Sequence, residues 1–416
     1  MNLLTINTSD CSADISGGVN QVTVALTRYF THQLGIACYI GFFQELPSGK
    51  CRLPEIKDGI LLNRQLDEEA FEHFLLRNKI DIVQVNYLRK EKIYVMRDIY
   101  RVAHRNGVKV IHAFHMAPLF QAGVYASWDK VWYSICHRER VWENFKFCMY
   151  DTFKSALNPI IMHILRPTYR MQWESCDKLV TLSPRYIQPF MQIAGVDDAS
   201  KFTAIGNELR YNIYLTEQEL EQKEKIVLVL QRMSEDTKRV SLSLRAWRRI
   251  EQSGRFLDWR MQVVGDGKDE MYYRHLLCKW KLKRAECTGR QEPLEYMKKA
   301  SLFLIASATE GWPMVLMEAS QMGLPMIAMD SYGAVHDIIS EDYNGKIVAN
   351  GDIGAFYKAM VELMEDDTKR MQMARNAVES SKRFEVAKVA AKWQALFDEL
   401  MRTSNESFHH HDHIQC

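Results

Sequence analysis

Two patterns of apolar residues alternate along most of this chain. Short continuous apolar runs predict buried parallel strands, while apolar residues that recur every three or four positions predict helices. Strands that alternate with helices predict an α/β protein with doubly wound parallel sheets. Strands are predicted at 1–7, 36–43, 80–85, 108–115, 178–183, 202–207, 226–230, 261–264, 286–290, 302–306, 326–329 and 346–348, and helices at 19–30, 68–77, 93–105, 353–364, 369–381 and 386–401.

The length of 416 residues suits two domains of ordinary size. A polar segment rich in Glu and Gln, Tyr211–Lys225, is predicted to link them. We therefore expect a first domain at 1–210 and a second at 225–383. The end of the chain, 403–416, contains a histidine cluster and is expected to be a disordered tail.

Charge and cysteine content narrow the class of protein. A formal net charge of +2 argues against a dedicated nucleic-acid binder. None of the nine cysteines forms a Cys-x-x-Cys pair, so neither a zinc site nor a disulfide framework is indicated, and reduced thiols in the cytoplasm are expected. The N-terminus lacks the features of a signal peptide, and no apolar run is long enough to span a bilayer.

The segment from Leu302 to Pro325 carries the most specific candidate chemistry. A buried strand is followed by Glu310, then by Pro313 at an expected helix start, and then by Glu318 within that helix. The first amides of the helix, those of Met314, Val315 and Leu316, would form an anion site, and the two carboxylates could each accept the protons of a vicinal diol. A nucleotide sugar has this layout of sugar, diphosphate and ribose. Taken singly, either glutamate is more simply a surface residue at a helix start or on a helix.

The Glu-x7-Glu motif from Glu310 to Glu318, with Gly-Trp-Pro inside it and Gly323-Leu324-Pro325 after it, resembles that of family 4 retaining glycosyltransferases of the GT-B fold. The resemblance implies two Rossmann-like domains with an interdomain cleft. It also implies that the last helix, 384–402, crosses back onto the first domain. It is strong from Val227 to Val348 and thin from Gln44 to Ser175.

Further site residues follow from the resemblance. Arg232 and Lys238, after the strand at 226–230, match the cations that bind the donor diphosphate, although Gln231 stands where the family often has Gly. Arg290 lies where the family places the nucleotide base. The Gly17-Gly18 pair matches a loop that faces the phosphates or the acceptor, and His115 matches a histidine that reaches the donor sugar. Without the resemblance, each of these is more simply a surface charge, a loop-to-helix joint or a structural histidine.

An aromatic and basic segment, 128–173, departs from the alternating pattern. We expect two or more helices, broken near Pro159 and Pro167. They either cover a sheet edge or form an amphipathic surface for lipid-linked acceptors at the inner face of the membrane.

The predicted function is retaining transfer of a sugar from a UDP- or GDP-sugar to a glycan or lipid-linked acceptor in polysaccharide assembly. In this prediction His115, Glu310, Arg232 and Lys238 act at the reacting centre, and Gly17, Gly18, Arg290, Met314, Val315 and Glu318 bind the donor. The family implies that no metal or other cofactor is required. A nucleotide-sugar epimerase of the same fold and a non-catalytic nucleotide-sugar-binding protein remain as alternatives.

Overall fold

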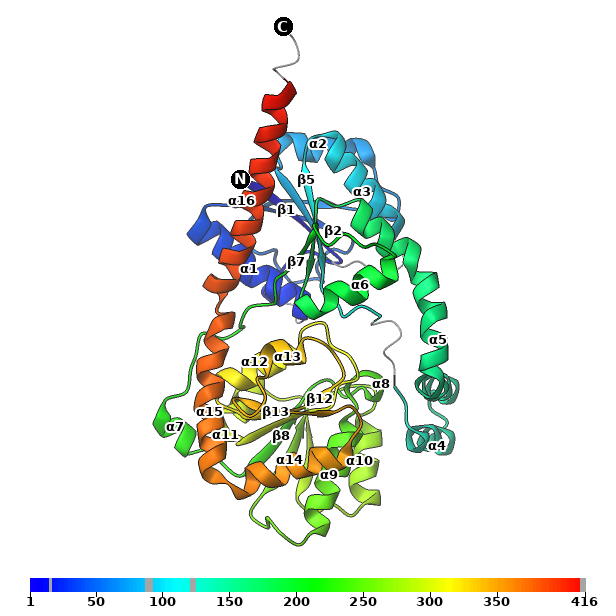
Figure 1. Cartoon of the computed structure of the whole chain (residues 1–416), viewed down its shortest axis with the longest axis vertical. Coiled ribbons are helices and arrows are strands. Elements are labelled where there is room, and N and C mark those ends of the chain that lie inside the picture. The colour runs from blue at the N-terminus through cyan, green and yellow to red at the C-terminus, as the bar shows by residue number, and fades with distance from the viewer. Residues whose placement is uncertain (15–16, 87–92, 120–124, 412–416) are drawn as a thin grey trace. The chain divides into compact units, whose positions relative to one another are not determined.

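The computed structural model describes residues 1–14, 17–86, 93–119 and 125–411. The chain divides into two compact units. Unit 1 consists of Met1–Met116, His163–Arg210 and Phe384–Cys416, and unit 2 consists of Ala117–Met162 and Tyr211–Arg383. Figure 1 shows that each unit is built around one sheet with helices packed beside it.

Unit 1 contains a wholly parallel sheet of seven strands in the order β3-β2-β1-β4-β5-β6-β7. The order reverses between β1 and β4, and crossovers that run in opposite directions from this point place their helices on opposite faces of the sheet. The carboxyl ends of β1 and β4 therefore border a crevice in which ligands of such sheets bind. The elements are β1 (Asn2–Asn7), α1 (Gly18–Leu34), β2 (Ala37–Phe42), β3 (Ile56–Leu61), α2 (Glu68–Arg77), β4 (Ile82–Asn86), α3 (Ile93–Arg105), β5 (Lys109–Phe114), β6 (Lys178–Thr181), α6 (Ile187–Ala194), β7 (Phe202–Ala204) and α16 (Val386–His411).

Unit 2 contains a second wholly parallel sheet, with six strands in the order β10-β9-β8-β11-β12-β13. Here the order reverses between β8 and β11. Its elements are α4 (Trp128–His137), α7 (Glu217–Glu221), β8 (Ile226–Leu230), α8 (Glu235–Lys238), α9 (Val240–Gln252), β9 (Arg260–Val264), α10 (Glu270–Lys279), β10 (Ala285–Gly289), α11 (Pro293–Lys299), β11 (Leu302–Ile305), α12 (Met314–Gln321), β12 (Met326–Asp330), α13 (Val335–Ile338), β13 (Gly345–Ala349), α14 (Ile353–Glu365) and α15 (Asp367–Ser381).

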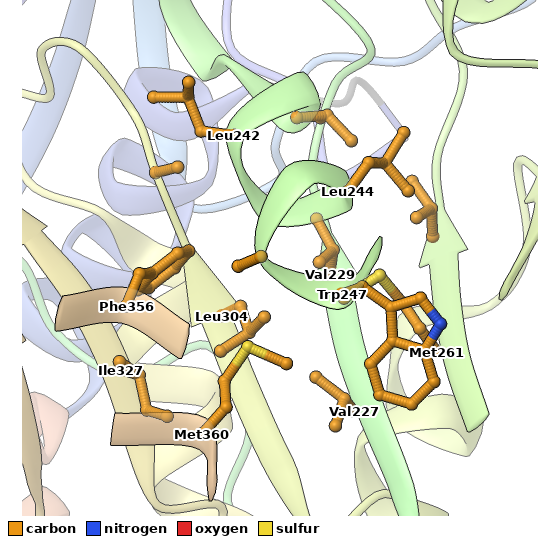
Figure 2. Close-up of a cluster of buried hydrophobic side chains, with 14 of the residues drawn as sticks. Val227, Val229, Leu242, Leu244, Trp247, Met261, Leu304, Ile327, Phe356 and Met360 are labelled. Atoms are coloured by element: carbon orange, nitrogen blue, oxygen red, sulfur yellow. The ribbon is translucent and has the colours of Figure 1, made fainter. Parts of the chain in front are cut away.

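The core of unit 2 fixes the strands from which the candidate site extends. Val227 and Val229 of β8 pack in one buried cluster with Trp247 of α9, Leu304 of β11 and Phe356 of α14 (Figure 2). Burying such side chains stabilises a fold by about 1.5–3 kcal/mol each. The loops after β8 and β11 therefore start from a rigid base.

These two sheets confirm the fold class predicted from the sequence, two doubly wound parallel α/β sheets. The predicted cleft between the domains stays a prediction. Gly17 and Gly18 lie at the start of α1, and Gly17 is the residue before its first turn.

The observed units differ from the predicted domains at 117–162, which group with unit 2 although they precede the predicted boundary at 210. The physical reason is packing: Tyr133 of α4 belongs to the core cluster of unit 2, and Lys130 forms a buried ion pair with Asp269. The last part of the chain, predicted as a helix that returns to the first domain, groups with unit 1. There Phe397 of α16 packs edge-on against Phe30 of α1, with ring centroids 5.6 Å apart.

The predicted breaks and end of two helices are wrong, and the predicted linker contains a short helix. The long helix α5 (Val141–Glu174) continues through Pro159 and Pro167, and its non-helical backbone lies at Phe153 instead. Helix α16 reaches His411, ten residues beyond the predicted end at Met401 and into the expected tail, because no Pro or Gly interrupts it; residues 412–416 lie outside the described part. The linker contains α7, whose start at Thr216 has a capping box with Glu219.

Candidate functional site

The loop after β8 carries both predicted cations. Arg232 is exposed, whereas Lys238 lies at the end of α8 with its side chain 23% exposed. Gln231 replaces the expected glycine and connects the two ends of the loop, because its amide nitrogen donates to the carbonyl of Lys238 at 3.1 Å. The departure from the family pattern therefore has a structural role.

Gly265 and Gly267, in the turn that follows β9, pack against the backbone of this loop. A Cβ atom at Gly265 would lie 2.1 Å from the carbonyl oxygen of Gln231, and one at Gly267 would lie 2.4 Å from that of Met233. Both glycines also have positive φ angles, 138° and 153°. The two glycines are thus required for close approach of two backbone segments.

The loops after β8 and β11 are joined at the point where the strand order reverses. Lys238 donates from Nζ to Oε1 of Glu310, and the amide of Ala308 donates to the carbonyl of Thr237 at 2.7 Å. Arg239, which is buried, donates to the carbonyls of Ala306 at 2.6 Å and Ser307 at 2.8 Å. The structure therefore brings together two of the predicted residues, Lys238 and Glu310, at the place where doubly wound sheets bind ligands.

Helix α12 begins one residue later than predicted, with Pro313 as the residue before the first turn. The amides of Met314 and Val315 lie in this first turn, but that of Leu316 donates to the carbonyl of Pro313 at 2.9 Å, so Leu316 is removed from the predicted anion site. Glu318 is buried, with 6% exposure, on the second turn of the helix. Gly323 follows the helix with a φ of 62°, as expected for a C-terminal glycine.

Arg290 lies farther along the same sheet edge. It is exposed and directly follows β10, whose last carbonyl, that of Gly289, accepts from the amide of Gly265 at 2.9 Å. The predicted unit 2 residues thus lie in the loops and helices that follow the strands of one sheet, and the structure pairs Lys238 with Glu310.

In unit 1, His115 follows β5 and belongs to a polar network at the reversal point of that sheet. Its Nε2 lies 3.1 Å from Oδ1 of Asn86, which also accepts from Gln84 at 3.0 Å. Asn86 in turn donates to Oδ1 of Asn7 at 2.6 Å. Because Asn86 Oδ1 is an acceptor, Nε2 of His115 carries the proton, and the buried Nδ1 has no hydrogen-bond partner within the described residues.

Burial keeps both histidines of this region neutral. Desolvation lowers the pKa of His115 to about 4 and, with a contribution from His115, that of His112 to about 3. At neutral pH, His115 therefore presents a lone pair on Nδ1 and no charge. A cavity of about 20 Å³ adjoins the network, enough for one water molecule. Its polar lining residues are Thr5, Thr23, Thr27, Gln84, Asn86, His115 and Asn207.

Sequence reasoning missed Asn86, Gln84 and Arg239 as parts of these sites. A usable signal existed for the first two, because polar residues at 84 and 86 interrupt an otherwise apolar buried strand. Arg239 gave no such signal, since a third charge after Arg232 and Lys238 resembles solvated surface.

Comparison with known proteins now identifies the second half of the chain. Residues 213–380 match the family described as "Glycosyl transferases group 1". This region belongs to that family, as the sequence predicted. The group 1 region contains Arg232, Lys238, Arg290, Glu310 and Glu318.

Relatives of known name extend the comparison. A Campylobacter jejuni protein named as an α-1,4-N-acetyl-D-galactosaminyltransferase acting on a diphospho-undecaprenol glycan is 23% identical over 59% of this chain and 66% of its own. Against three other curated relatives, the match spans 16%, 42% and 43% of the relative's length.

Two solved structures share the fold of the whole chain. The lipopolysaccharide outer core galactosyltransferase WaaB has a TM-score of 0.69 at 16% identity, covering 96% of this chain and all of WaaB. HepE from Anabaena, solved with UDP-glucose, has a TM-score of 0.67 at 14% identity, covering 97% and 100%. At these identities the likeness establishes the fold.

The described residues show neither a membrane-spanning helix nor a cluster of metal ligands. None of the helices there is both long and apolar enough to cross a membrane. No group of three or more His, Cys, Asp or Glu side chains is arranged to hold a metal ion in that part of the chain. The predicted independence from metal stays a prediction.

Proposed function

We propose that this protein transfers a sugar from a nucleotide-diphosphate sugar to a glycan or lipid-linked acceptor, with retention of configuration at the sugar carbon. The observation that carries the proposal is the Lys238–Glu310 pair, which sits in the group 1 region between the two loops at the reversal point of the sheet. HepE, solved with UDP-glucose, supports a UDP-sugar donor. The named acceptor of the Campylobacter relative supports a lipid-linked glycan. The eight cysteines in the described part of the chain are free, which is in keeping with a cytoplasmic reaction.

The proposed chemistry is electrostatic. As the bond between the sugar and the diphosphate breaks, negative charge grows on the leaving phosphate, and prepositioned cations stabilise it. Arg232 supplies a planar pair of donors and Lys238 a point charge. The amides of Met314 and Val315 in the first turn of α12 assist, because the amino end of a helix favours anions.

The carboxylates are proposed to hold hydroxyl groups. Glu310, whose Oε1 accepts from the ammonium of Lys238, would also accept from a hydroxyl of the transferred sugar. Glu318 would bind the ribose, and Arg290 would lie against the base. In unit 1, neutral His115 would accept a hydrogen bond from a sugar hydroxyl at Nδ1. Gly17 and Gly18 would leave room for an acceptor, since a Cβ at either glycine meets no atom of the described residues within 4 Å.

Release of nucleotide from a panel of UDP- and GDP-sugars, with and without lipid-linked acceptors, tests the proposal. We expect Arg232→Ala, Lys238→Ala and Glu310→Gln each to lower turnover by about 100-fold or more, the usual effect of removing a charge-stabilising donor. Lys299→Ala, which removes an exposed cation at the end of α11, is the matched control and should keep full activity.

Other results would contradict the proposal in distinguishable ways. Full activity in all three variants would remove the assigned roles. Nucleotide binding without turnover of any acceptor would indicate a binding protein, and altered free sugar released without an acceptor would indicate an epimerase.

A further inference from the structure

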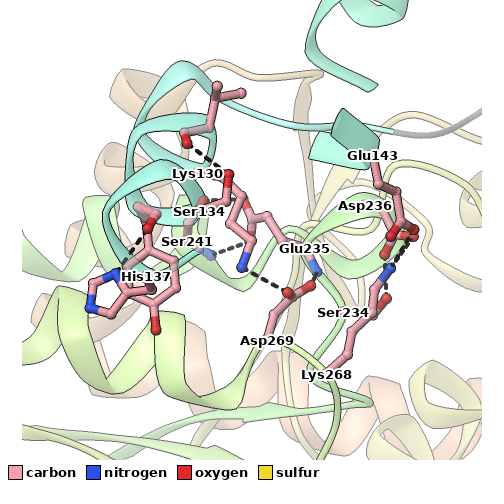
Figure 3. Close-up of polar contacts among 12 residues, drawn as sticks. Lys130, Ser134, His137, Glu143, Ser234, Glu235, Asp236, Ser241, Lys268 and Asp269 are labelled. Atoms are coloured by element: carbon pink, nitrogen blue, oxygen red, sulfur yellow. Dashed lines mark hydrogen bonds and ion pairs between the residues drawn. The ribbon is translucent and has the colours of Figure 1, made fainter. Parts of the chain in front are cut away.

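The outer face of α4 is apolar, although nothing in the described part of unit 2 covers it. Trp128, Trp132 and Ile135 are 53%, 64% and 45% exposed, and their spacing of four and three residues puts them on one side of the helix. The opposite side, with Lys130, Tyr133, Ser134 and His137, faces unit 2 (Figure 3). The helix is therefore held by one face and presents the other.

The start of α5 continues this face. Trp142 is 76% exposed and Phe145 is 37% exposed. The ring of Phe145 lies 6.3 Å from that of Trp128 and 6.3 Å from that of Trp142, edge-on to both. A small shared core, formed by Ala126, Val131 and Cys148, holds the two helices together beneath. Trp128, Trp132, Ile135, Trp142 and Phe145, which we call the aromatic face, thus form one surface across two helices.

Positive charge borders the aromatic face. Arg138 and Arg140, in the turn between α4 and α5, and Lys146 are exposed, and within the described part of the chain they form no ion pair with a carboxylate. Among the carboxylates near these cations, Glu139 is exposed, while Asp129 and Glu143, with side chains 39% and 43% exposed, pair with Arg245 and Lys268.

We propose that the aromatic face binds the surface of an anionic lipid bilayer. Tryptophan side chains favour the boundary between acyl chains and headgroups, and neighbouring Arg and Lys residues attract acidic headgroups. Helices with this division of residues lie in the plane of the interface. A second copy of the chain is a poorer fit, because two faces bordered by the same positive charges repel. The proposal does not depend on the transfer reaction.

Sedimentation with vesicles tests it, using the full chain and vesicles of phosphatidylcholine with or without phosphatidylglycerol. We expect binding to vesicles with phosphatidylglycerol that weakens as salt is raised. Trp132→Ser with Trp142→Ser should lower the partition coefficient by at least about tenfold, from the loss of buried aromatic area. Arg138→Glu with Arg140→Glu should lower it by roughly fivefold or more for each charge.

Matched controls separate this surface from general stickiness. Leu257→Ser changes a side chain that is 74% exposed elsewhere on unit 2, and Lys299→Glu reverses an exposed charge on α11; both should bind as wild type does. All variants should keep the wild-type unfolding temperature, since each changed side chain is exposed. Absence of vesicle binding, or binding that the aromatic variants leave unchanged, would overturn the proposal. So would concentration-dependent self-association that the same variants abolish, which would assign the face to a protein contact.

Discussion

In unit 1, the protonation of His115 is set by side chains that are distant from it in the chain. The family resemblance predicts a role for His115, but the atoms that set its protonation belong to Asn86 and, through it, to Asn7. These two asparagines are 79 positions apart in the chain. Their contact depends on which strands pair, and β1 pairs with β4 as well as with β2, its neighbour in sequence. Residue types alone do not contain this information.

Glu208, next to Asn207 of the same region, allows a prediction at this scale. It is buried, with 2% exposure, and desolvation raises its pKa to about 8. A raised pKa means that the folded state binds the proton more tightly than the unfolded state. Its contribution to stability is therefore complete below the unfolded pKa of about 4.5 and is lost as pH rises to about 8. We expect Glu208→Gln to flatten this fall and to raise the free energy of unfolding at pH 7 by about 2–3 kcal/mol.

Urea denaturation between pH 5 and 9 measures this effect. Glu379→Gln, at a carboxylate that is 66% exposed, is the control and should follow the wild-type curve. A pH dependence in Glu208→Gln that equals the wild type would show that this carboxyl group does not titrate as its burial implies.

Helices and strands are predicted correctly where the hydrophobic pattern is clear, and incorrectly where polar residues or prolines interrupt that pattern. The buried strands of both sheets appear in sequence as apolar runs, and their order was not needed to find them. Strand β3 escaped notice because Ile56–Leu61 lies at a sheet edge and includes Lys, Asp and Gly. In α5, Pro159 and Pro167 predict breaks in the helix, whereas the spacing of apolar residues predicts that it continues. The helix continues through both prolines.

The glycine turn after β9 gives a prediction at the scale of elements. Gly265→Ala would force a Cβ against the carbonyl of Gln231 and so displace the loop that carries Arg232 and Lys238. We expect a loss of about 2–4 kcal/mol in unfolding free energy and weaker binding of UDP. Thermal unfolding and calorimetric titration measure the two effects.

Gly254→Ala is the matched control, because Gly254 also has a positive φ, 69°, but a Cβ there meets no atom within 4 Å. It should lose only the cost of the backbone conformation, about 1 kcal/mol, and bind UDP normally. Equal losses in both variants would mean that backbone strain, and not collision with the loop, explains the result.

At the scale of the whole molecule, the assignment of the 117–162 segment to unit 2 was beyond the reach of the sequence. Hydrophobic spacing shows that α4 has a face to bury, but not which sheet will cover it. The buried ion pair between Lys130 and Asp269, with Nζ and Oδ1 2.8 Å apart, fixes α4 against the sheet of unit 2 (Figure 3). Asp269 also accepts from the amide of Glu235 at 2.7 Å, so α4 is connected to the start of α8.

This pair predicts how firmly the segment is attached. Lys130→Met leaves the buried carboxylate of Asp269 without its cation and should cost about 3–5 kcal/mol of unfolding free energy. Lys130→Met with Asp269→Asn should cost less than the sum of the two single changes, which a double-mutant cycle by urea denaturation measures. Arg170→Met, which breaks the exposed pair with Glu174, should cost less than 1 kcal/mol. Additive losses at 130 and 269 would show that the pair is not coupled.

The connections of the loop after β8 have a consequence for the thermodynamics of ligand binding. The side chains of Gln231, Lys238 and Arg239 and the amide of Ala308 order this loop through contacts within the protein itself. A segment that is ordered in advance loses little conformational freedom when a ligand arrives. Less of the binding free energy is therefore offset by the entropy cost of ordering the backbone. The affinity then depends more directly on how well the charges of the ligand match those of the loop.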